Sequence, residues 1–381
     1  MSKKIVVVNQ SSGYLMVDIA NALTERYDKV ALISGSLEIG DVQLDSTVER
    51  YKIIRYDRRN AIYRVLTWLV GFLQICWRLK RLKGFEVLYV TNPPISYFAT
   101  FFIKRPYSIL IYDIYPDVLI NIGLTRNNWI YRQWGKINRS VFANAKMVFT
   151  ISEGMKRSLT NYVTDEKIKV IPIWTHLDRF GFVNKKENPF LKENGIQDKF
   201  IILYSGNMGY THDVDIMVDV AELMTNNKDV LFVFIGDGLK KKILQERVQK
   251  KDLSNCLFFP WQPIEHIHYS LSAGHIGFVS LNARTALASV PSKTFNLMAC
   301  GVPILAISPK ESELSNLLNI YSNGRNFECT DNLELIKRFI IELKDNPDIY
   351  AQMCSRSIEG ARDFSVENAQ RFGAYLFEEQ G

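Results

Sequence analysis

The feature that most constrains the fold is an alternation of short, nearly all-apolar segments with helical patterns. Helical patterns cover residues 15–26 and 129–143, for example. Short apolar strands separated by helices are typical of a parallel sheet that is covered on both faces. The strand candidates of the first half are KIVVVNQ, VALISG, ERYKIIRY, VLYVTN, SILIYDIYP, MVFTIS and IKVIPI. The sequence therefore predicts an α/β, doubly wound fold.

A polar segment divides this alternation into two series. Residues 182–199 are rich in charge and contain Pro189 and Gly195, which is typical of a linker. The second series has the strand candidates FIILYSGN, VLFVFIGDG, CLFFPW, HIGFVSL and PILAIS. With 381 residues, two domains are the natural expectation. We predict a Rossmann-like domain over residues 1–180, a linker over 181–198, a second Rossmann-like domain over 199–360 and a C-terminal helix within 361–381.

The composition of the chain limits which partners and which cellular compartment we expect. The 47 Lys and Arg against 40 Asp and Glu give a net charge of +7, which suits an anionic ligand or an anionic membrane surface. The five cysteines are scattered and form no Cys-x-x-Cys pair, which argues against a zinc site and a disulfide framework. The N-terminus lacks the features of a signal peptide. We expect a cytoplasmic protein.

The longest uncharged apolar segment, Val65 to Trp77, is too short to span a membrane, which takes about 20 residues. Basic residues flank it between Arg58 and Lys83. A helix of this kind fits the surface of an anionic leaflet, which would place the protein on the inner face of the plasma membrane. The alternative is a core helix with solvated ends. The sequence leaves both open.

The segment VPSKTFNLMACGVPILA suggests a phosphate site at the start of a short helix. Pro291 and Gly301 bracket the helix, and Ser292 is a plausible N-cap. Free backbone N–H groups at such a start attract phosphate, and Lys293 adds a positive charge. The alternative is an ordinary capped helix with an exposed lysine.

Three more loops follow strands of the same series, so all of them are expected at one edge of the second sheet. YSGNMGYTH contains glycines that let the backbone approach a ligand, FIGDG is a tight turn, and FFPWQP ends a strand in an aromatic residue. Each loop alone is weak evidence, because such turns are common. The candidate ligand contacts are Gly206, Asn207, His212, Asp237, Gly238, Trp261 and Gln262.

The first domain has two candidate positions. Gly13 permits a close turn before a helix, although neither the G-x-G-x-x-G spacing nor a Walker loop is present. Asp113 follows a strand in YDIYPD, where its carboxylate is suited to orient an acceptor hydroxyl. The alternative is that Asp113 is a buried, hydrogen-bonded turn residue and that Asp117 caps the helix after Pro116.

Together these motifs resemble the family-four glycosyltransferases, which have the GT-B fold. The resemblance covers almost the whole chain and rests on LYSGNMG, FIGDG, FFPWQP and SVPSKTFNLMACGVPILA, together with IYDIYPDVLINIGL, MVFTISEGM and KVIPIWTHLDRF. It is strongest to the branch of capsule, O-antigen and exopolysaccharide assembly that includes N-acetylfucosamine-type transferases.

The resemblance implies two Rossmann-like domains facing across a cleft, with the C-terminal helix crossing back to the first domain. It implies a retaining hexosyltransferase that binds a nucleotide sugar, with UDP favoured, mainly in the second domain, and a polyprenyl-diphosphate-linked saccharide acceptor in the first. No cofactor or metal is expected, because the helix start carries the diphosphate charge. Ser292, Lys293 and the amide of Thr294 would hold the diphosphate, Trp261 and Gln262 would line the base pocket, and Asp113 would orient the acceptor.

The chain departs from the family at charged positions. Asn207 and His212 stand where most members have arginine and lysine, and Ala288 and Asn296 stand where many have glutamates. Asn296 retains an amide for a ribose contact, and Lys293 carries more of the phosphate charge. Replacements for the missing groups are sought at Asn282, Arg284 and Ser289. Two alternatives remain: a UDP-sugar 2-epimerase, and a non-catalytic partner with the same fold.

Overall fold

The computed structural model describes residues 2–38, 42–57, 59–209, 212–281 and 290–378. It divides into two compact units. The first unit comprises Met1–Ile173 with Val366–Gly381, and the second comprises Trp174–Ser365. Each unit is built on one large parallel sheet with helices on both faces, as the sequence predicts.

The first unit is built on a seven-stranded parallel sheet with the order β5-β3-β1-β6-β7-β8-β9. Its central strands are buried and mostly apolar because helices cover both sides, whereas the edge strand β5 is polar. Two short strands, β2 (Ser11–Gly13) and β4 (Ser36–Glu38), pair separately. The seven strands are β1 (Lys4–Val8), β3 (Lys29–Ser34), β5 (Glu49–Lys52), β6 (Glu86–Val90), β7 (Tyr107–Ile111), β8 (Val148–Thr150) and β9 (Ile168–Val170).

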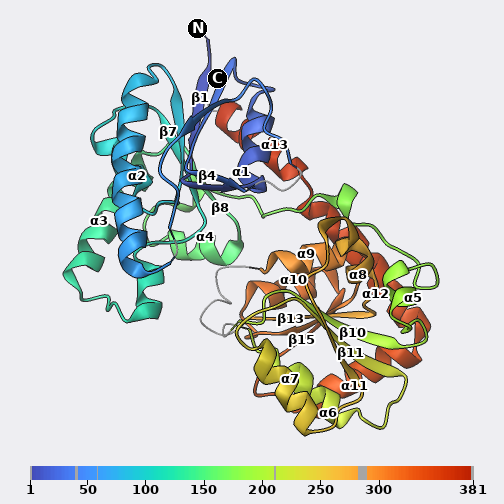
Figure 1. Cartoon of the computed structure of the whole chain (residues 1–381). Coiled ribbons are helices and arrows are strands. Elements are labelled where there is room, and N and C mark those ends of the chain that lie inside the picture. The colour runs from blue at the N-terminus through green and yellow to red at the C-terminus, as the bar shows by residue number, and fades with distance from the viewer. Residues whose placement is uncertain (1, 39–41, 58, 210–211, 282–289, 379–381) are drawn as a thin grey trace. The chain divides into compact units, whose positions relative to one another are not determined.

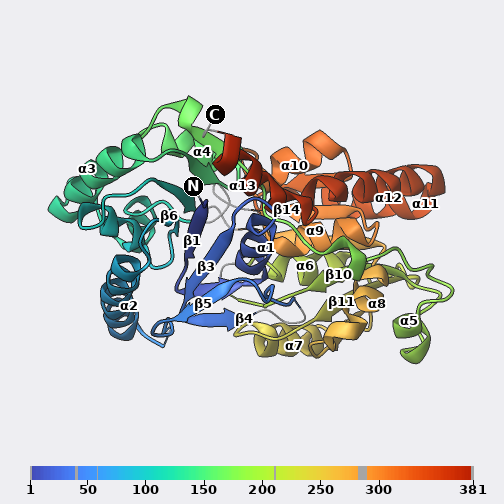
Figure 2. The same cartoon turned by 90° about the horizontal axis from the view of Figure 1, so that it is seen from above.

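Helices α1 (Tyr14–Leu23) and α13 (Glu367–Glu378) lie on one face of this sheet, and α2 (Ala61–Arg81) and α3 (Trp129–Asn144) lie on the other, as Figures 1 and 2 show. The C-terminal helix α13 packs against α1, as expected from the resemblance. A further helix, α4 (Glu153–Leu159), follows β8. The predicted helices at residues 15–26 and 129–143 are therefore confirmed.

The second unit has a six-stranded parallel sheet with the order β12-β11-β10-β13-β14-β15. Its strands are β10 (Phe200–Ser205), β11 (Val230–Ile235), β12 (Cys256–Phe259), β13 (Ile276–Ser280), β14 (Ile304–Ile307) and β15 (Gly324–Phe327). Figure 1 shows one face covered by α6 (Asp215–Leu223), α7 (Lys241–Lys250) and α11 (Leu333–Asp345). The other face carries α8 (Ile267–Ser272), α9 (Ser292–Ala299), α10 (Glu313–Tyr321) and α12 (Pro347–Ala361).

The expected linker is not a free connection. Residues 181–198 lie within the second unit and contain a short helix, α5 (Pro189–Glu193), which packs against α8. Phe190 and Leu191 are buried, and Asn188 donates to the Tyr269 carbonyl oxygen at 2.8 Å. Because the segment as a whole is polar, its composition did not indicate that these two apolar side chains are buried. The chain changes units at Ile173/Trp174 and again at Ser365/Val366.

Helix α2 packs one stripe of its surface against the sheet and leaves large apolar side chains exposed elsewhere. Its buried residues Thr67, Gly71, Ile75 and Leu79 recur at every fourth position and form one stripe against the sheet. Outside that stripe large apolar side chains remain exposed, which departs from the polar outer face of an ordinary surface helix. They are Ile62, Tyr63, Val65, Leu66, Leu69, Val70, Leu73 and Trp77. Among the described residues no helix is long and apolar enough to cross a membrane.

Candidate functional site

The predicted loops of the second unit meet at one sheet edge. Strands β12, β11, β10 and β13 are neighbours and parallel, so the loops after them leave from the same side. Gly206, Gly236 and Gly238 have φ values of +151°, +128° and +141°, which favour glycine. A Cβ on Gly236 would lie 2.2 Å from the Gly206 carbonyl oxygen. These glycines therefore let the loops after β10 and β11 pack backbone against backbone.

Lys293 is the charged group at this edge. Its Nζ lies 4.1 Å from the centroid of the Tyr204 ring. It also approaches Gly206, since a Cβ there would lie 3.4 Å from Nζ. Burial lowers the pKa of Lys293 to about 7. Within the described residues no carboxylate forms an ion pair with Lys293. Its amino group therefore lies beside the Tyr204 ring without a neutralising charge.

The start of α9 differs from the expectation in two respects. Pro291, not Ser292, occupies the N-cap position, and no side chain caps the helix. The amide of Thr294 donates to the Pro291 carbonyl oxygen at 2.9 Å, so this amide is already paired within the helix start. Helix geometry leaves the amides of Ser292 and Lys293 for a ligand. The Thr294 hydroxyl is buried and has no partner within the described part of the chain.

His212 and Asn207 lie at the same edge as Lys293. Nδ1 of His212 is 3.1 Å from the Ser280 carbonyl oxygen. Burial and the neighbouring Lys293 lower the pKa of His212, so the ring is neutral at pH 7. The side chain of Asn207 is exposed, whereas its backbone carbonyl oxygen accepts the Tyr204 hydroxyl at 2.6 Å.

Two of the remaining candidate ligand contacts in the second unit form hydrogen bonds to nearby backbone groups. The Asp237 carboxylate accepts the Gly238 amide at 2.8 Å, and the Gln262 amide donates to Pro260 at 3.0 Å. Trp261 is 55% exposed, so its ring is accessible to a stacking partner.

The amide side chain of Asn296 is used within the protein. Its Oδ1 accepts the Thr175 hydroxyl at 2.7 Å, so the acceptor end of this amide is already paired. Asn282, Arg284 and Ser289 lie outside the described residues.

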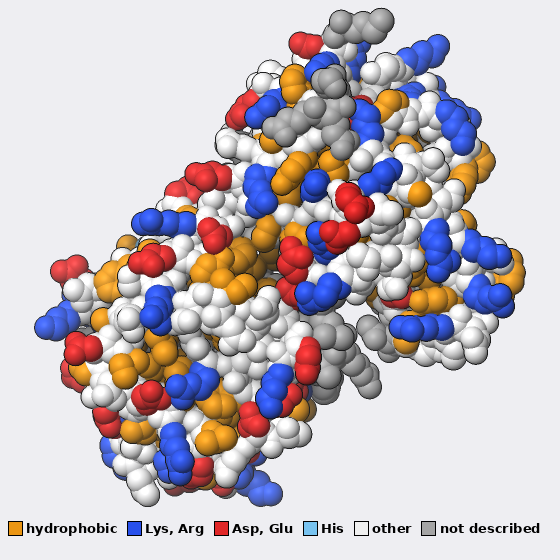
Figure 3. All heavy atoms as spheres, turned by 180° about the vertical axis from the view of Figure 1, so that it is seen from behind, with side chains coloured by type: hydrophobic (Ala, Val, Ile, Leu, Met, Phe, Trp, Pro, Cys, Tyr) orange, Lys and Arg blue, Asp and Glu red, His pale blue; other side chains and the backbone are white. Residues whose placement is uncertain are grey.

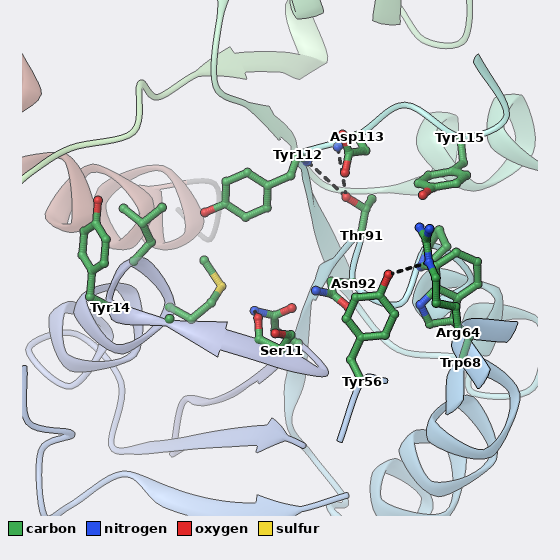
Figure 4. A pocket seen from close by; sticks show the side chains of 15 residues that line it. Ser11, Tyr14, Tyr56, Arg64, Trp68, Thr91, Asn92, Tyr112, Asp113 and Tyr115 are labelled. Atoms are coloured by element: carbon green, nitrogen blue, oxygen red, sulfur yellow. Dashed lines mark hydrogen bonds between the residues drawn. The ribbon is translucent and has the colours of Figure 1, made fainter. Parts of the chain in front are cut away.

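The first unit contains a pocket of about 400 Å³ at the ends of β1, β6 and β7. Figure 4 shows Tyr14 and Tyr112 at one end and Tyr56, Arg64, Trp68 and Tyr115 at the other. Gly13 lies at the rim, at the start of α1, in an extended conformation that does not require glycine. The walls are thus largely aromatic, as in sites that stack sugar rings or bases.

Asp113 lines this pocket. Thr91 Oγ accepts the amides of Tyr112 at 3.1 Å and of Asp113 at 3.5 Å, which fixes the turn after β7. The surrounding protein raises the pKa of Asp113, although its side chain retains contact with solvent. Within the described residues its carboxylate accepts no hydrogen bond, which departs from the buried turn residue of the alternative.

Asp117 does not line this pocket, and its side chain caps no helix. Its two carboxylate oxygens accept the hydroxyl groups of Tyr131 and Tyr162, each at 2.6 Å.

Sequence reasoning missed three polar side chains of the pocket. Asn9 Oδ1, Asn92 Oδ1 and Trp68 Nε1 are buried and have no hydrogen-bond partner among the described residues. Buried polar atoms are normally paired, so two acceptors and one donor in one pocket indicate a polar ligand. Arg64 is held at the rim, where its Nε donates to the Tyr56 hydroxyl at 3.1 Å. The signal in the sequence was the polar residue after each strand, in VVNQ and VTNPP.

No group of three His, Cys, Asp or Glu side chains in the described part of the chain is placed to hold a metal ion. All five cysteines are free thiols.

Comparison with known proteins agrees with this architecture. Residues 186–364 match the family model described as "Glycosyl transferases group 1". The probable glycosyltransferase WbjE of Pseudomonas aeruginosa is 24% identical over 293 residues, which cover 74% of this chain and 72% of WbjE. The putative colanic acid biosynthesis glycosyl transferase WcaI of Escherichia coli K12 is 27% identical over 217 residues, which cover 55% of this chain and 53% of WcaI.

Solved structures share the fold over the full length. HepE (Alr3699) of Anabaena in complex with UDP has a TM-score of 0.74 at 15% identity and covers 99% of this chain and 100% of its own. WaaG, a glycosyltransferase involved in lipopolysaccharide biosynthesis, has a TM-score of 0.70 at 14% identity and covers 98% and 99%. The fold is therefore GT-B, and the family match and the relatives support a glycosyltransferase.

Proposed function

We propose that the protein is a retaining glycosyltransferase that moves a sugar from a nucleotide sugar, with UDP as the favoured nucleotide, to a lipid-linked glycan. The observation that carries this proposal is Lys293, a half-buried cation beside the free amides of a helix start, with no ion-pair partner among the described residues. A diphosphate supplies the missing charge and accepts from those amides. The bound UDP of HepE supports the choice of base.

The leaving group is stabilised in the second unit. As the bond between the anomeric carbon and the diphosphate oxygen breaks, negative charge grows on that oxygen. Lys293 and the amides of Ser292 and Lys293 oppose this charge without a metal ion. The exposed ring of Trp261 stacks on the base, and the N–H groups of Asn296 bind the ribose.

The acceptor binds in the aromatic pocket of the first unit. Sugar rings stack on its tyrosine and tryptophan rings, while sugar hydroxyls pair with Asn9, Asn92 and Trp68. Asp113 orients the attacking hydroxyl. That hydroxyl attacks the anomeric carbon on the face from which the diphosphate departs, and the departing oxygen takes its proton.

Helix α2 connects this acceptor pocket to a membrane. Its residues Arg64 and Trp68 line the pocket, while Leu66, Leu69 and Leu73 are exposed. Arg59, Arg78 and Arg81 border the exposed face, so the helix has both the apolar surface and the charge that an anionic leaflet binds. These features support a position at the inner face of the plasma membrane, and the name of WcaI supports a role in the synthesis of a bacterial surface polysaccharide.

The first experiment is calorimetric titration with UDP, GDP and ADP, with and without magnesium, on the wild type and on Lys293→Ala. We expect metal-independent binding of UDP that the variant loses. If no nucleotide binds, the chain is a non-catalytic partner. If UDP binds equally well to both proteins, the diphosphate assignment is wrong.

A second experiment separates transfer from epimerisation. Wild-type enzyme is incubated with a UDP-sugar alone and with a lipid extract as the acceptor source, and the products are identified by mass spectrometry and NMR. Transfer requires the extract and releases UDP. An altered UDP-sugar in the absence of extract would identify an epimerase.

A further inference from the structure

One buried polar side chain of the first unit, Gln10, lies behind the aromatic pocket. Unlike the charged and apolar side chains that are interspersed over the surface in Figure 3, Gln10 is fully buried, two residues after β1. It does not line the pocket, whereas its neighbours Asn9 and Ser11 do. Gln10 is therefore placed to support the pocket without contacting a ligand.

The hydrogen bonds of Gln10 reach three segments that surround the pocket. Its backbone amide donates to the Asn92 carbonyl oxygen at 2.6 Å, in the loop after β6. Its side-chain Nε2 donates to the carbonyl oxygens of Ile54 at 3.2 Å and of Thr67 at 2.8 Å. Each of these segments also contributes side chains to the pocket. The pocket residues on them are Tyr56, Arg64, Trp68 and Asn92.

Two of these segments, residues 53–57 and helix α2, form one wall of the pocket. They are attached to each other, because Gln74 Oε1 of α2 accepts the Ile54 amide at 2.6 Å. Together they carry the rings of Tyr56 and Trp68, which are stacked with their centroids 6.0 Å apart. The side chain of Gln10 joins this aromatic wall, Tyr56 and Trp68, to the end of β1.

Helix α2 makes room for the Gln10 amide with a glycine. A Cβ on Gly71 would lie 2.6 Å from Gln10 Nε2 and 3.0 Å from its Cδ, so a larger residue would displace the amide. Gly71 lies in the interior of α2, where glycine stabilises a helix less than alanine does. The helix therefore gives up local stability for the close approach of Gln10.

The same amide is unfavourable for stability in a second way. Its Oε1 is buried and accepts no hydrogen bond from the described residues. Buried polar atoms are normally paired, and a buried acceptor without a donor is destabilising. Stability therefore does not account for a glutamine at this position. Departures of this kind from local rules are typical of functional sites.

We propose that Gln10 is a positioning residue of the acceptor site. It sets the distance between the aromatic wall and the strand ends that carry Asn9 and Asn92. The proposal rests on the proposed function, because that function assigns the acceptor to this pocket. An acceptor that stacks on the wall and also pairs with Asn9 and Asn92 binds tightly only when this distance is right.

Two variants act on the contact from opposite sides. Gln10→Met keeps the length of the side chain but removes both N–H donors. Gly71→Ala adds the Cβ that displaces the amide and leaves Gln10 in place. Ile75→Val is the control, because it trims a buried side chain of the same helix, one turn beyond Gly71.

The first measurement needs no substrate. The full-length protein, which has six tryptophans, is labelled with 5-fluorotryptophan, and Trp68→Phe identifies the fluorine resonance of Trp68. Gln10→Met and Gly71→Ala should shift or broaden this resonance, because both release the aromatic wall. Ile75→Val should leave the resonance as in the wild type.

The second measurement separates positioning from a general loss of stability. Transfer from a UDP-sugar is followed against rising amounts of lipid extract as the acceptor source. Gln10→Met should raise the half-saturating amount of extract about tenfold, close to the net contribution of one hydrogen bond, and leave the maximal rate within about twofold. Ile75→Val should match the wild type in both quantities, and UDP titration should be unchanged in every variant.

A double variant tests whether Gly71 acts through Gln10. In the Gln10→Ala background the amide is gone, so Gly71→Ala should cause no further rise in the half-saturating amount of extract. An equal rise in both backgrounds would show that the two residues act independently.

The proposal is overturned if Gln10→Met and Gly71→Ala show the Trp68 resonance of the wild type. It is also overturned if their maximal rate falls while the half-saturating amount of extract is unchanged, since that result indicates a structural role only. If the wild type transfers no sugar to the extract, the proposed function fails, and the fluorine spectra still decide whether Gln10 positions the aromatic wall.

Discussion

At the scale of single residues, Lys293 determines how ligand binding depends on pH. Its pKa of about 7 belongs to the ligand-free protein, and a bound diphosphate raises that pKa. Between the two values, the free protein holds a neutral lysine and the complex holds an ammonium. Binding of UDP at about pH 8 should therefore take up nearly one proton. Calorimetry in two buffers of different ionisation enthalpy measures this uptake; uptake by Lys293 should be absent below about pH 6, where the free protein already holds an ammonium.

The same residue should cost stability in the absence of ligand. The pKa of Lys293 lies below its unfolded value of 10.5, so the unfolded chain binds the extra proton. The cost is fully present below about pH 7 and disappears as pH rises toward 10.5. Lys293→Met should therefore melt higher than wild type near pH 7, by about 2–4 °C for each kcal/mol recovered. The difference in melting temperature should shrink by pH 10. If Lys293→Met melted at the same temperature as wild type or lower at both pH 7 and pH 10, the assignment would be contradicted.

The limits of sequence reasoning are clearest at this scale. The sequence placed Gly206, Gly238 and Lys293 at one sheet edge, because the ends of parallel strands must meet there. It did not find Trp68 or Asn92, which come from a helix and a loop that only packing brings together. The hydrogen bond from the Thr294 amide to the Pro291 carbonyl oxygen forms in a tight turn at the helix start. The periodicity of the sequence does not reveal such a turn.

At the scale of elements, the glycines of the second unit allow a matched comparison. Gly236→Ala would place a Cβ 2.2 Å from the Gly206 carbonyl oxygen, at a φ of +128°. Gly195→Ala has a φ of +63° and nothing within 4 Å, so it carries only the conformational cost of about 1 kcal/mol. Chemical denaturation should show Gly236→Ala as the more destabilised by several kcal/mol. Because both loops meet at Gly206, it should also lose UDP binding, whereas Gly195→Ala should retain it.

Helix α2 gives a second prediction at this scale. Leu66→Gln/Leu73→Gln should weaken binding to anionic vesicles, because both side chains are more than half exposed and each would bury apolar surface in the lipid. Leu239→Gln/Ile320→Gln changes equally exposed side chains of the second unit and should bind like wild type. Sedimentation with phosphatidylglycerol vesicles compares the two. Equal binding of both variants would mean that the exposed face of α2 does not contact membrane.

At the scale of the whole molecule, the sequence predicted two α/β units, and the chain passes between them a few residues away from the predicted boundaries. The alternation of strands and helices is a local pattern, so the sequence alone predicts these elements with little ambiguity. Unit membership is a matter of long-range packing: the segment 181–198 is polar in composition, yet Phe190 and Leu191 anchor it to α8. For the same reason the resemblance, not the periodicity, supplied the position of α13.

The return of α13 to the first unit makes that unit depend on the last residues of the chain. Phe372 is buried 4.9 Å from Phe149 between ring centroids, Leu376 is buried, and Tyr27 donates to the Leu376 carbonyl oxygen at 3.4 Å. A chain ending at Ser365 would lose roughly 5 kcal/mol of apolar burial there, comparable with the stability of a domain. Scanning calorimetry should show the first unit melting at a much lower temperature or not at all, while UDP binding by the second unit persists. If both units lost stability together, α13 would be stabilising more than the unit it packs on.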